Sequence, residues 1–117
     1  MQGGAGLGYR IDHIDERTRF QAIPTARVID FPNGAGSVQL KVVNDDLERG
    51  RRETLDITVR DSDAALATWL ASQRGQISGR DIAAHAECSF GEVSDLLKAL
   101  CRGELLMPLW FDPLPSN

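Results

Sequence analysis

Hydrophobic and polar residues alternate along two stretches in the first half of the chain, residues 37–43 and 53–60. A period of two is typical of strands that bury one face and expose the other to water. A third run rich in β-branched residues, 26–31, ends in the sequence PNGAG, which is a strong turn signal. We therefore predict three strands, the last two joined as a hairpin by a long polar loop, NDDLERGRR. The alternating apolar positions are Val38, Leu40, Val42, Leu55, Ile57 and Val59.

The second half of the chain changes to a helical period. A first helix is expected to begin at Asp61 or Ser62, which are good N-cap residues, and to end by Gly75. Ser78 and Ser89 each open a capping pattern, S-x-x-D and S-x-x-E, which predicts the start of a second and a third helix. The apolar stripe of the third helix follows the spacing i, i+3, i+4, i+7, i+8 before a glycine ends it. These residues are Val93, Leu96, Leu97, Leu100, Cys101 and Gly103.

The order of elements is three strands, three helices and a short extended tail, which predicts an α+β fold. We expect a winged-helix-like domain over residues 24–112, with a three-stranded antiparallel sheet beside a helix bundle that contains a helix-turn-helix. Residues 1–23 are predicted to form a flexible glycine-rich start and an N-terminal arm, and residues 113–117 a C-terminal tail.

Length and composition fit one globular domain of 117 residues with a net charge of -4. No apolar run is long enough to cross a membrane, and the start of the chain lacks the layout of a signal peptide. Both cysteines fall in helical patterns rather than in a disulfide framework, which favours a reducing cytoplasm.

Candidate chemistry is sparse. His85 and Cys88 lie three positions apart, but the paired Cys/His spacings of a zinc site are missing, and Cys101 belongs to an apolar stripe. No set of Ser, His and Asp forms a recognisable catalytic pattern, and the paired acids lie in loop and cap contexts. We therefore expect no catalytic residues, no metal site and no cofactor.

The helix-turn-helix raises the possibility of DNA binding, but its charge argues against it. Residues 78–104 contain three basic and five acidic side chains, and the third helix opens with Glu92 and Asp95. Acidic groups at that position repel phosphates, which supply most of the affinity for DNA. The alternative nucleic-acid contact is a basic cluster in the loop between strands: Arg49, Arg51 and Arg52.

A protein segment is the favoured partner. A three-stranded sheet leaves at least one edge with unpaired N–H and C=O groups, to which an extended peptide can add. The stretch TLDITV is the natural template, because Thr54, Asp56 and Thr58 form a polar face opposite the apolar one. Two alternatives stay open: the strand is internal, or the N-terminal arm covers its edge.

The stretch from SVQLKVV through ETLDITVRDSDAALATWL to FGEVSDLLKALCRGELL resembles the peptide-recognition element of systems that modify ribosomally made peptides, including the pyrroloquinoline-quinone peptide chaperone. The resemblance covers about two thirds of the chain and implies that a leader peptide pairs with the third strand and lies against the third helix. Two features depart from that family: the long NDDLERGRR insertion and the substantial arm. By position, the implied contacts are Glu53, Thr54, Asp56, Thr58, Arg60, Asp95, Lys98 and Arg102.

A second resemblance competes with the first. The stretches IPTARV and GQISGRDIAAHA are similar to winged-helix domains that close the C-terminus of some protein methyltransferases and cupin-type oxygenases. This resemblance implies an accessory or dimerisation domain of a larger enzyme. A homodimer through the segment LLMPLWF is a further expectation, since Leu109, Trp110 and Phe111 are apolar. The alternative is that these side chains pack back on the first helix beside Trp69.

Overall fold

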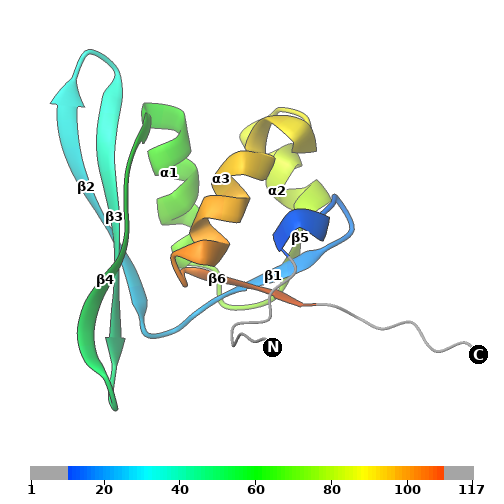
Figure 1. Ribbon diagram of the computed structural model, residues 1–117. Helices are drawn as coiled ribbons and strands as arrows, with labels where there is room; N and C mark the ends of the chain where they lie inside the picture. The colour runs from blue at the N-terminus through cyan, green and yellow to red at the C-terminus, as the bar shows by residue number, and fades with distance from the viewer. Residues whose placement is uncertain (1–10, 110–117) are drawn as a thin grey trace, which may run out of the picture.

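The computed structural model describes residues 11–109, which form a mixed α+β fold with two three-stranded antiparallel sheets and three α-helices (Figure 1). The elements in chain order are a short 3-10 helix (Ile11–His13), β1 (Arg19–Ala22), β2 (Ala26–Gly34), β3 (Ser37–Asp46), β4 (Gly50–Arg60), α1 (Asp61–Ala71), β5 (Ile77–Ser78), α2 (Gly79–Ala86), α3 (Phe90–Arg102) and β6 (Leu106–Leu109). No helix in this part of the chain is long and apolar enough to cross a membrane.

The large sheet has the order β2-β3-β4 and contains all three predicted strands. Val42 lies opposite Val28 and Leu55, and Leu40 lies opposite Ile57, so the apolar positions share one face. That face packs against the helices, which stand on one side of the sheet in Figure 1. The predicted long loop is wrong, because β3 and β4 run through most of NDDLERGRR and leave only residues 47–49 to turn. Backbone N–H groups of Glu48 and Arg49 donate to the Asp46 carboxylate and close this turn.

The small sheet has the order β5-β1-β6, and no simple strand-then-helix order describes the chain. Its central strand, β1, comes from the predicted N-terminal arm. Phe20 on this strand is fully buried and lies opposite Ile77 on one side and Pro108 on the other. Pro108 is tolerated because β6 is an edge strand, where a missing N–H costs no ladder bond. The arm is therefore part of the core, together with Ile14.

Helices α2 and α3 begin as the capping patterns predict, whereas the N-cap of α1 is Arg60 in place of the expected Asp61 or Ser62. The Ser78 hydroxyl accepts from the N–H of Asp81, and Ser89 and Glu92 form a complete capping box. The predicted stripe of α3 is buried in the core shared by both sheets. The predicted dimer segment is described only as far as Leu109, which is half-buried; Trp110 and Phe111 lie outside the described residues.

Candidate functional site at the edge of strand β4

Strand β4 is an edge strand, as the peptide-binding hypothesis requires. It pairs with β3 alone, and no other strand among residues 11–109 hydrogen-bonds to its outer side. The N-terminal arm does not cover it within the described range, because β1 lies in the other sheet (Figure 1). An edge of this kind presents a row of N–H and C=O groups that a further strand can use.

The face of β4 that points away from the helices is polar, and its acidic residues form ion pairs with a neighbouring strand. Glu53 and Asp56 lie 3.4 and 3.7 Å from the Lys41 ammonium on the neighbouring strand. The Thr58 hydroxyl lies 3.4 Å from the Gln39 amide oxygen. These three predicted contact residues are exposed on the sheet face that the helices leave open. Because such exposed ion pairs contribute little, they leave the side chains free to rearrange around a partner.

Thr54 departs from the predicted alternation. Leu55 lies opposite Val42 and Glu53 lies opposite Val43, so Thr54 is the extra residue of a β-bulge. The bulge turns its side chain away from the polar face, and its hydroxyl donates to the Gly103 carbonyl at the end of α3. Thr54 therefore joins the strand to the helix instead of facing solvent with Asp56 and Thr58.

Helix α3 runs beside the β4 edge. Gly103 lies so close that a Cβ atom there would be 2.7 Å from Leu55 Cβ, and at the other end Glu92 lines a pocket with Arg60. On a helix these two positions share one stripe with Leu96 and Ala99. The predicted α3 contacts lie roughly a quarter turn away on the helix surface. These are Asp95 and Arg102, which are exposed, and Lys98, which is half-buried.

A pocket of about 170 Å³ lies where β4 runs into α1; we call it the Arg60 pocket. Its apolar lining includes Leu66 and Val93, both buried in the core. Arg60 and Asp63 form its polar rim, with the Arg60 Nε 3.3 Å from the Asp63 carboxylate. The hydrogen bond and the charge of Asp63 raise the pKa of Arg60, which keeps the guanidinium charged. The full lining is Arg60, Ser62, Asp63, Leu66, Ala86, Cys88, Glu92 and Val93.

The sequence did not reveal this pocket, because its lining comes from β4, from all three helices and from the segment joining α2 to α3. No local motif connects these positions. The buried stripe of α3, which includes Val93, was the one available signal. Glu92 lines the pocket in addition to forming the capping box, and the capping pattern alone gives no sign of this second position.

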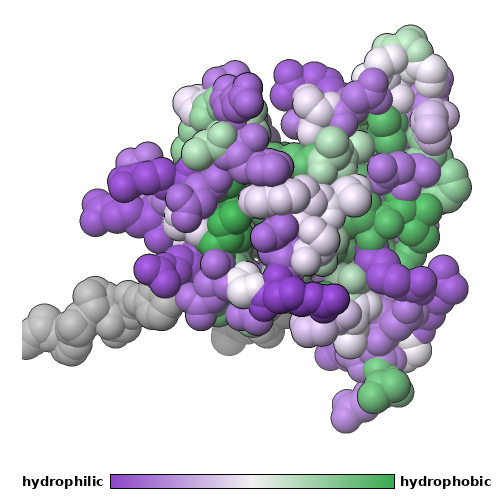
Figure 2. Space-filling model, turned by 180° about the vertical axis from the view of Figure 1, so that it is seen from behind, coloured by the Kyte–Doolittle hydropathy of each residue, from purple (hydrophilic) through white to green (hydrophobic). Residues whose placement is uncertain are grey.

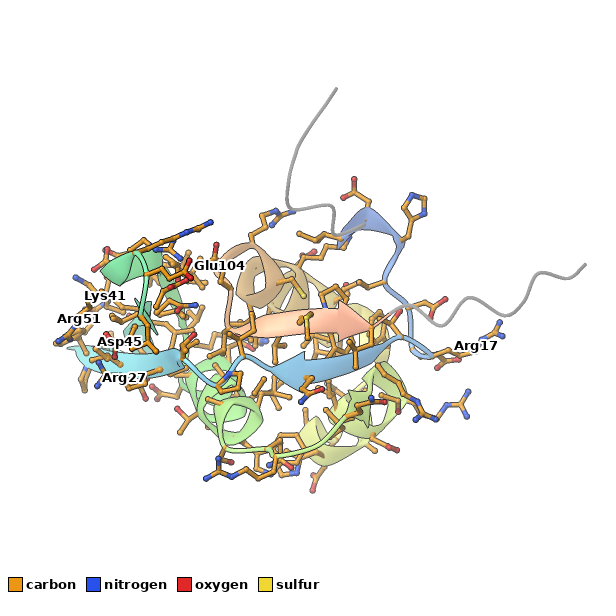
Figure 3. The ribbon with its side chains drawn as sticks, turned by 90° about the horizontal axis from the view of Figure 1, so that it is seen from below. Arg17, Arg27, Lys41, Asp45, Arg51 and Glu104 are labelled. Atoms are coloured by element: carbon orange, nitrogen blue, oxygen red, sulfur yellow. The ribbon has the colours of Figure 1, made fainter. Side chains whose placement is uncertain are left out.

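The basic cluster predicted as the nucleic-acid alternative is divided between two faces of the sheet. Arg49 and Arg51 are exposed near the tip of the β3-β4 hairpin, which projects beyond the helices in Figure 1. Arg52 points to the helix side, where its guanidinium lies 3.0 Å from the Glu104 carboxylate. Figure 3 shows Arg51 among Arg27, Lys41 and Asp45 on the far side of the sheet from Glu104. Arg27 and Asp45 form an ion pair of 2.6 Å.

Cys101 and His85, which were considered as possible nucleophiles or metal ligands, make structural contacts. Burial raises the pKa of the Cys101 thiol to about 12, so it is a neutral core group at physiological pH. The exposed His85 ring stacks on Trp69, with ring centroids 3.6 Å apart. Among residues 11–109 no three His, Cys, Asp or Glu side chains are grouped so that they could hold a metal ion.

Comparison with known proteins adds no assignment. No protein family, no curated protein and no solved structure matches this chain. The geometry of the β4 edge, α3 and the Arg60 pocket is therefore the basis for proposing a function.

Proposed function

We propose that this protein is a non-catalytic domain that binds an extended peptide or protein segment along the β4 edge, beside α3. The observation that carries the proposal is an eleven-residue edge strand with no outer partner in the described chain, next to a helix and a pocket. Main-chain hydrogen bonds to β4 would supply affinity. The Arg60 pocket would select an apolar side chain of the partner, because apolar groups line its floor and charges form its rim.

We further propose that the helical half is a winged-helix variant. In a winged helix a short strand lies between the first two helices, and a two-stranded wing follows the third. Here β5 lies between α1 and α2, β6 follows α3, and β1 pairs with both. The N-terminal segment would thus supply the second strand of the wing. This arrangement supports the winged-helix prediction.

DNA reading has weaker support from the same geometry. The exposed side of α3 carries Glu92 and Asp95, and Arg52 is engaged by Glu104. Arg49 and Arg51 alone offer too few phosphate contacts for strong duplex binding. We expect a mobility-shift assay at low salt to detect no duplex binding that depends on these two arginines.

The main test begins with short random peptides displayed as a library and selected on the full chain. Binding by strand addition requires the N–H groups on one side of the peptide. We therefore expect N-methylation at alternate positions in one register to abolish binding, and the same modification in the other register to leave it unchanged. Each lost hydrogen bond is worth about 0.5–1.5 kcal/mol, so several together remove detectable binding. Equal effects of the two registers would exclude strand addition.

A pair of variants locates the binding site. Ser62 is exposed at the first turn of α1 and lines the Arg60 pocket. Ser62→Trp is expected to fill the pocket and weaken the selected peptide at least tenfold. Thr68→Trp places the same side chain at another exposed position of α1 and serves as the matched control. Loss of binding in both variants, or in neither, would place the peptide elsewhere.

A further inference from the structure

A second pocket lies across the molecule from the tip of the β3-β4 hairpin and gathers arginines in an acidic protein. It has a volume of about 310 Å³ and is lined by Glu16, Arg17, Arg19, Ser78 and Arg80. We call it the Arg80 pocket. Its lining carries three positive charges and one negative charge, whereas the whole chain has a net charge of -4. In Figure 3, Arg17 lies across the molecule from the cluster that contains Lys41 and Arg51.

The backbone that carries these arginines is unusually well fixed for a surface segment. The Asp15 carboxylate accepts hydrogen bonds from the N–H groups of Arg17 and Thr18, at 2.8 and 3.1 Å. The N–H of Gly79 donates to the Thr18 carbonyl, and that of Arg80 to the Glu16 carbonyl, each at 2.8 Å. The segment of residues 15–18 and the start of α2 are therefore joined as one unit.

Gly79 permits this close approach. A Cβ atom at position 79 would lie 2.7 Å from the Asp15 carbonyl oxygen and 2.6 Å from the Phe90 ring. Only a residue without a side chain allows the first turn of α2 to contact the 15–18 segment. The strand pairing of Arg19 with Ser78 continues the same connection into the small sheet. The three arginines thus extend from a preorganised backbone, which lowers the entropic cost of ordering them around a ligand.

We propose that the Arg80 pocket binds one compact oxyanion, specifically a phosphate monoester group. The guanidinium of arginine matches phosphate oxygens in a bidentate geometry, and arginine is the main charged residue of this lining. Acidic groups at Asp15, Glu16 and Asp81 border the arginines, so the positive region is small. A duplex needs a row of phosphate contacts, and this border opposes such a surface. Hydrophilic side chains also gather over this end of the molecule, at the left of Figure 2.

The Glu16 carboxylate would compete with a bound phosphate for the Arg80 guanidinium. Its carboxylate lies 3.6 Å from the Arg80 guanidinium, and both side chains are more than half exposed, so the pair is weak and exchangeable. A bound phosphate would take over Arg80 from Glu16. This competition predicts opposite effects of two substitutions on phosphate affinity. Removing the Glu16 charge should tighten binding, and removing Arg80 should weaken it.

The test follows backbone amide NMR shifts of the full chain during titration with inorganic phosphate at constant ionic strength, with chloride as the reference salt. We expect saturable shifts centred on residues 16–19 and 78–81. Arg80→Ala should weaken the affinity about tenfold, corresponding to one charge-assisted contact. Glu16→Gln should tighten it several-fold. Arg74→Ala, at an exposed arginine outside the pocket lining, is the matched control and should change nothing.

The source of the phosphate is decided by a second titration. A phosphoserine peptide that binds more tightly than inorganic phosphate identifies a phosphorylated partner, and equal affinity identifies a small phosphate-containing molecule. Shifts that do not saturate, or an affinity that is unchanged in both the Arg80→Ala and the Glu16→Gln variants, would overturn the proposal. Tighter binding of a short duplex with steep salt dependence would overturn it as well. None of these outcomes depends on peptide binding at the β4 edge.

Discussion

The large sheet is made from consecutive strands joined by tight turns, whereas the small sheet brings together residues 19–22, 77–78 and 106–109. Local alternation and turn residues define the first. Burial of a few side chains from distant segments defines the second, above all Phe20 and Leu106. The two sheets nevertheless share one core, so they are expected to unfold together. Within residues 11–109 the long sheet leaves one edge of β4 unpaired, and the short one joins the N-terminal segment to the segments before α2 and after α3.

The most severe way to break this arrangement is to remove the central side chain of the small sheet. Phe20→Ala should lower the free energy of unfolding by about 3–5 kcal/mol, because Phe20 is fully buried. Phe31→Ala on the large sheet is the control, since Phe31 is 48% exposed, and should change stability by no more than about 0.5 kcal/mol. Chemical denaturation measures both. Two separate transitions in the wild-type protein would show that the sheets are independent.

A smaller effect is expected at the junction between the sheets, where α3 ends against β4. Gly103→Ala introduces a Cβ atom 2.7 Å from Leu55 Cβ and should destabilise the protein by about 1–3 kcal/mol. Gly75→Ala is the matched control, because nothing lies within 4 Å of a Cβ atom there. Thermal unfolding compares the two. Equal stability of both variants would show that α3 can move away from β4 without cost.

The bulge at Thr54 provides a finer test of the same junction. Thr54→Val keeps the shape of the side chain but leaves the Gly103 carbonyl without its hydroxyl donor, at a cost of about 1 kcal/mol. Thr58→Val removes a hydroxyl from the exposed face of β4 and should be nearly neutral. Denaturant midpoints distinguish them. If Thr58→Val were the more damaging change, the assignment of the two faces would be reversed.

The weakest effect belongs to the hairpin tip. Hydrogen bonds from the backbone of Glu48 and then of Arg49 lower the pKa of Asp46 below its ordinary value of 3.8. A lowered pKa in the folded state stabilises the fold above the unfolded pKa, and this contribution disappears as the pH falls through the folded value. Amide shifts of residues 47–50 should therefore stay constant near neutral pH and change in acid. Asp46→Asn should remove that dependence, and its persistence would assign the change to another carboxyl group.

The two sheets also differ in how far the sequence predicts them. Alternation in residues 37–43 and 53–60 was enough for β3 and β4, and the capping serines placed α2 and α3. β5 is only two residues long, so no periodicity can reveal it. β1 exists because the core accepts Phe20, which is a tertiary cause that no local pattern contains. The loop between β3 and β4 was overestimated because charged residues continue the ladder, with Asp45 opposite Arg51.

The candidate site likewise has features that the sequence predicts and features that it does not. The strand and the polar residues at 56 and 58 could be predicted from alternation, because that pattern determines which side chains share a face. Glu53 shares their face only because of the bulge at Thr54, which alternation does not reveal. The direction of α3 could not, because it depends on Gly103 contacting Leu55. With Gly103 against Leu55, it is Glu92 that lines the pocket beside Arg60, whereas the expected Asp95 and Arg102 do not line it.

The central position of β1 also sets an order of events during synthesis. The hairpins of the large sheet can form as soon as residue 60 has emerged, since their partners are neighbours in the chain. β1 is synthesised before the strands of the large sheet, yet its partners at 77–78 and 106–109 are synthesised after them. Pairings between such distant segments form slowly because the intervening chain must first be ordered. The ring of Phe20 would thus stay without its β6 partners until residues 106–109 have been synthesised, and the domain would close only when the segment after α3 reaches it.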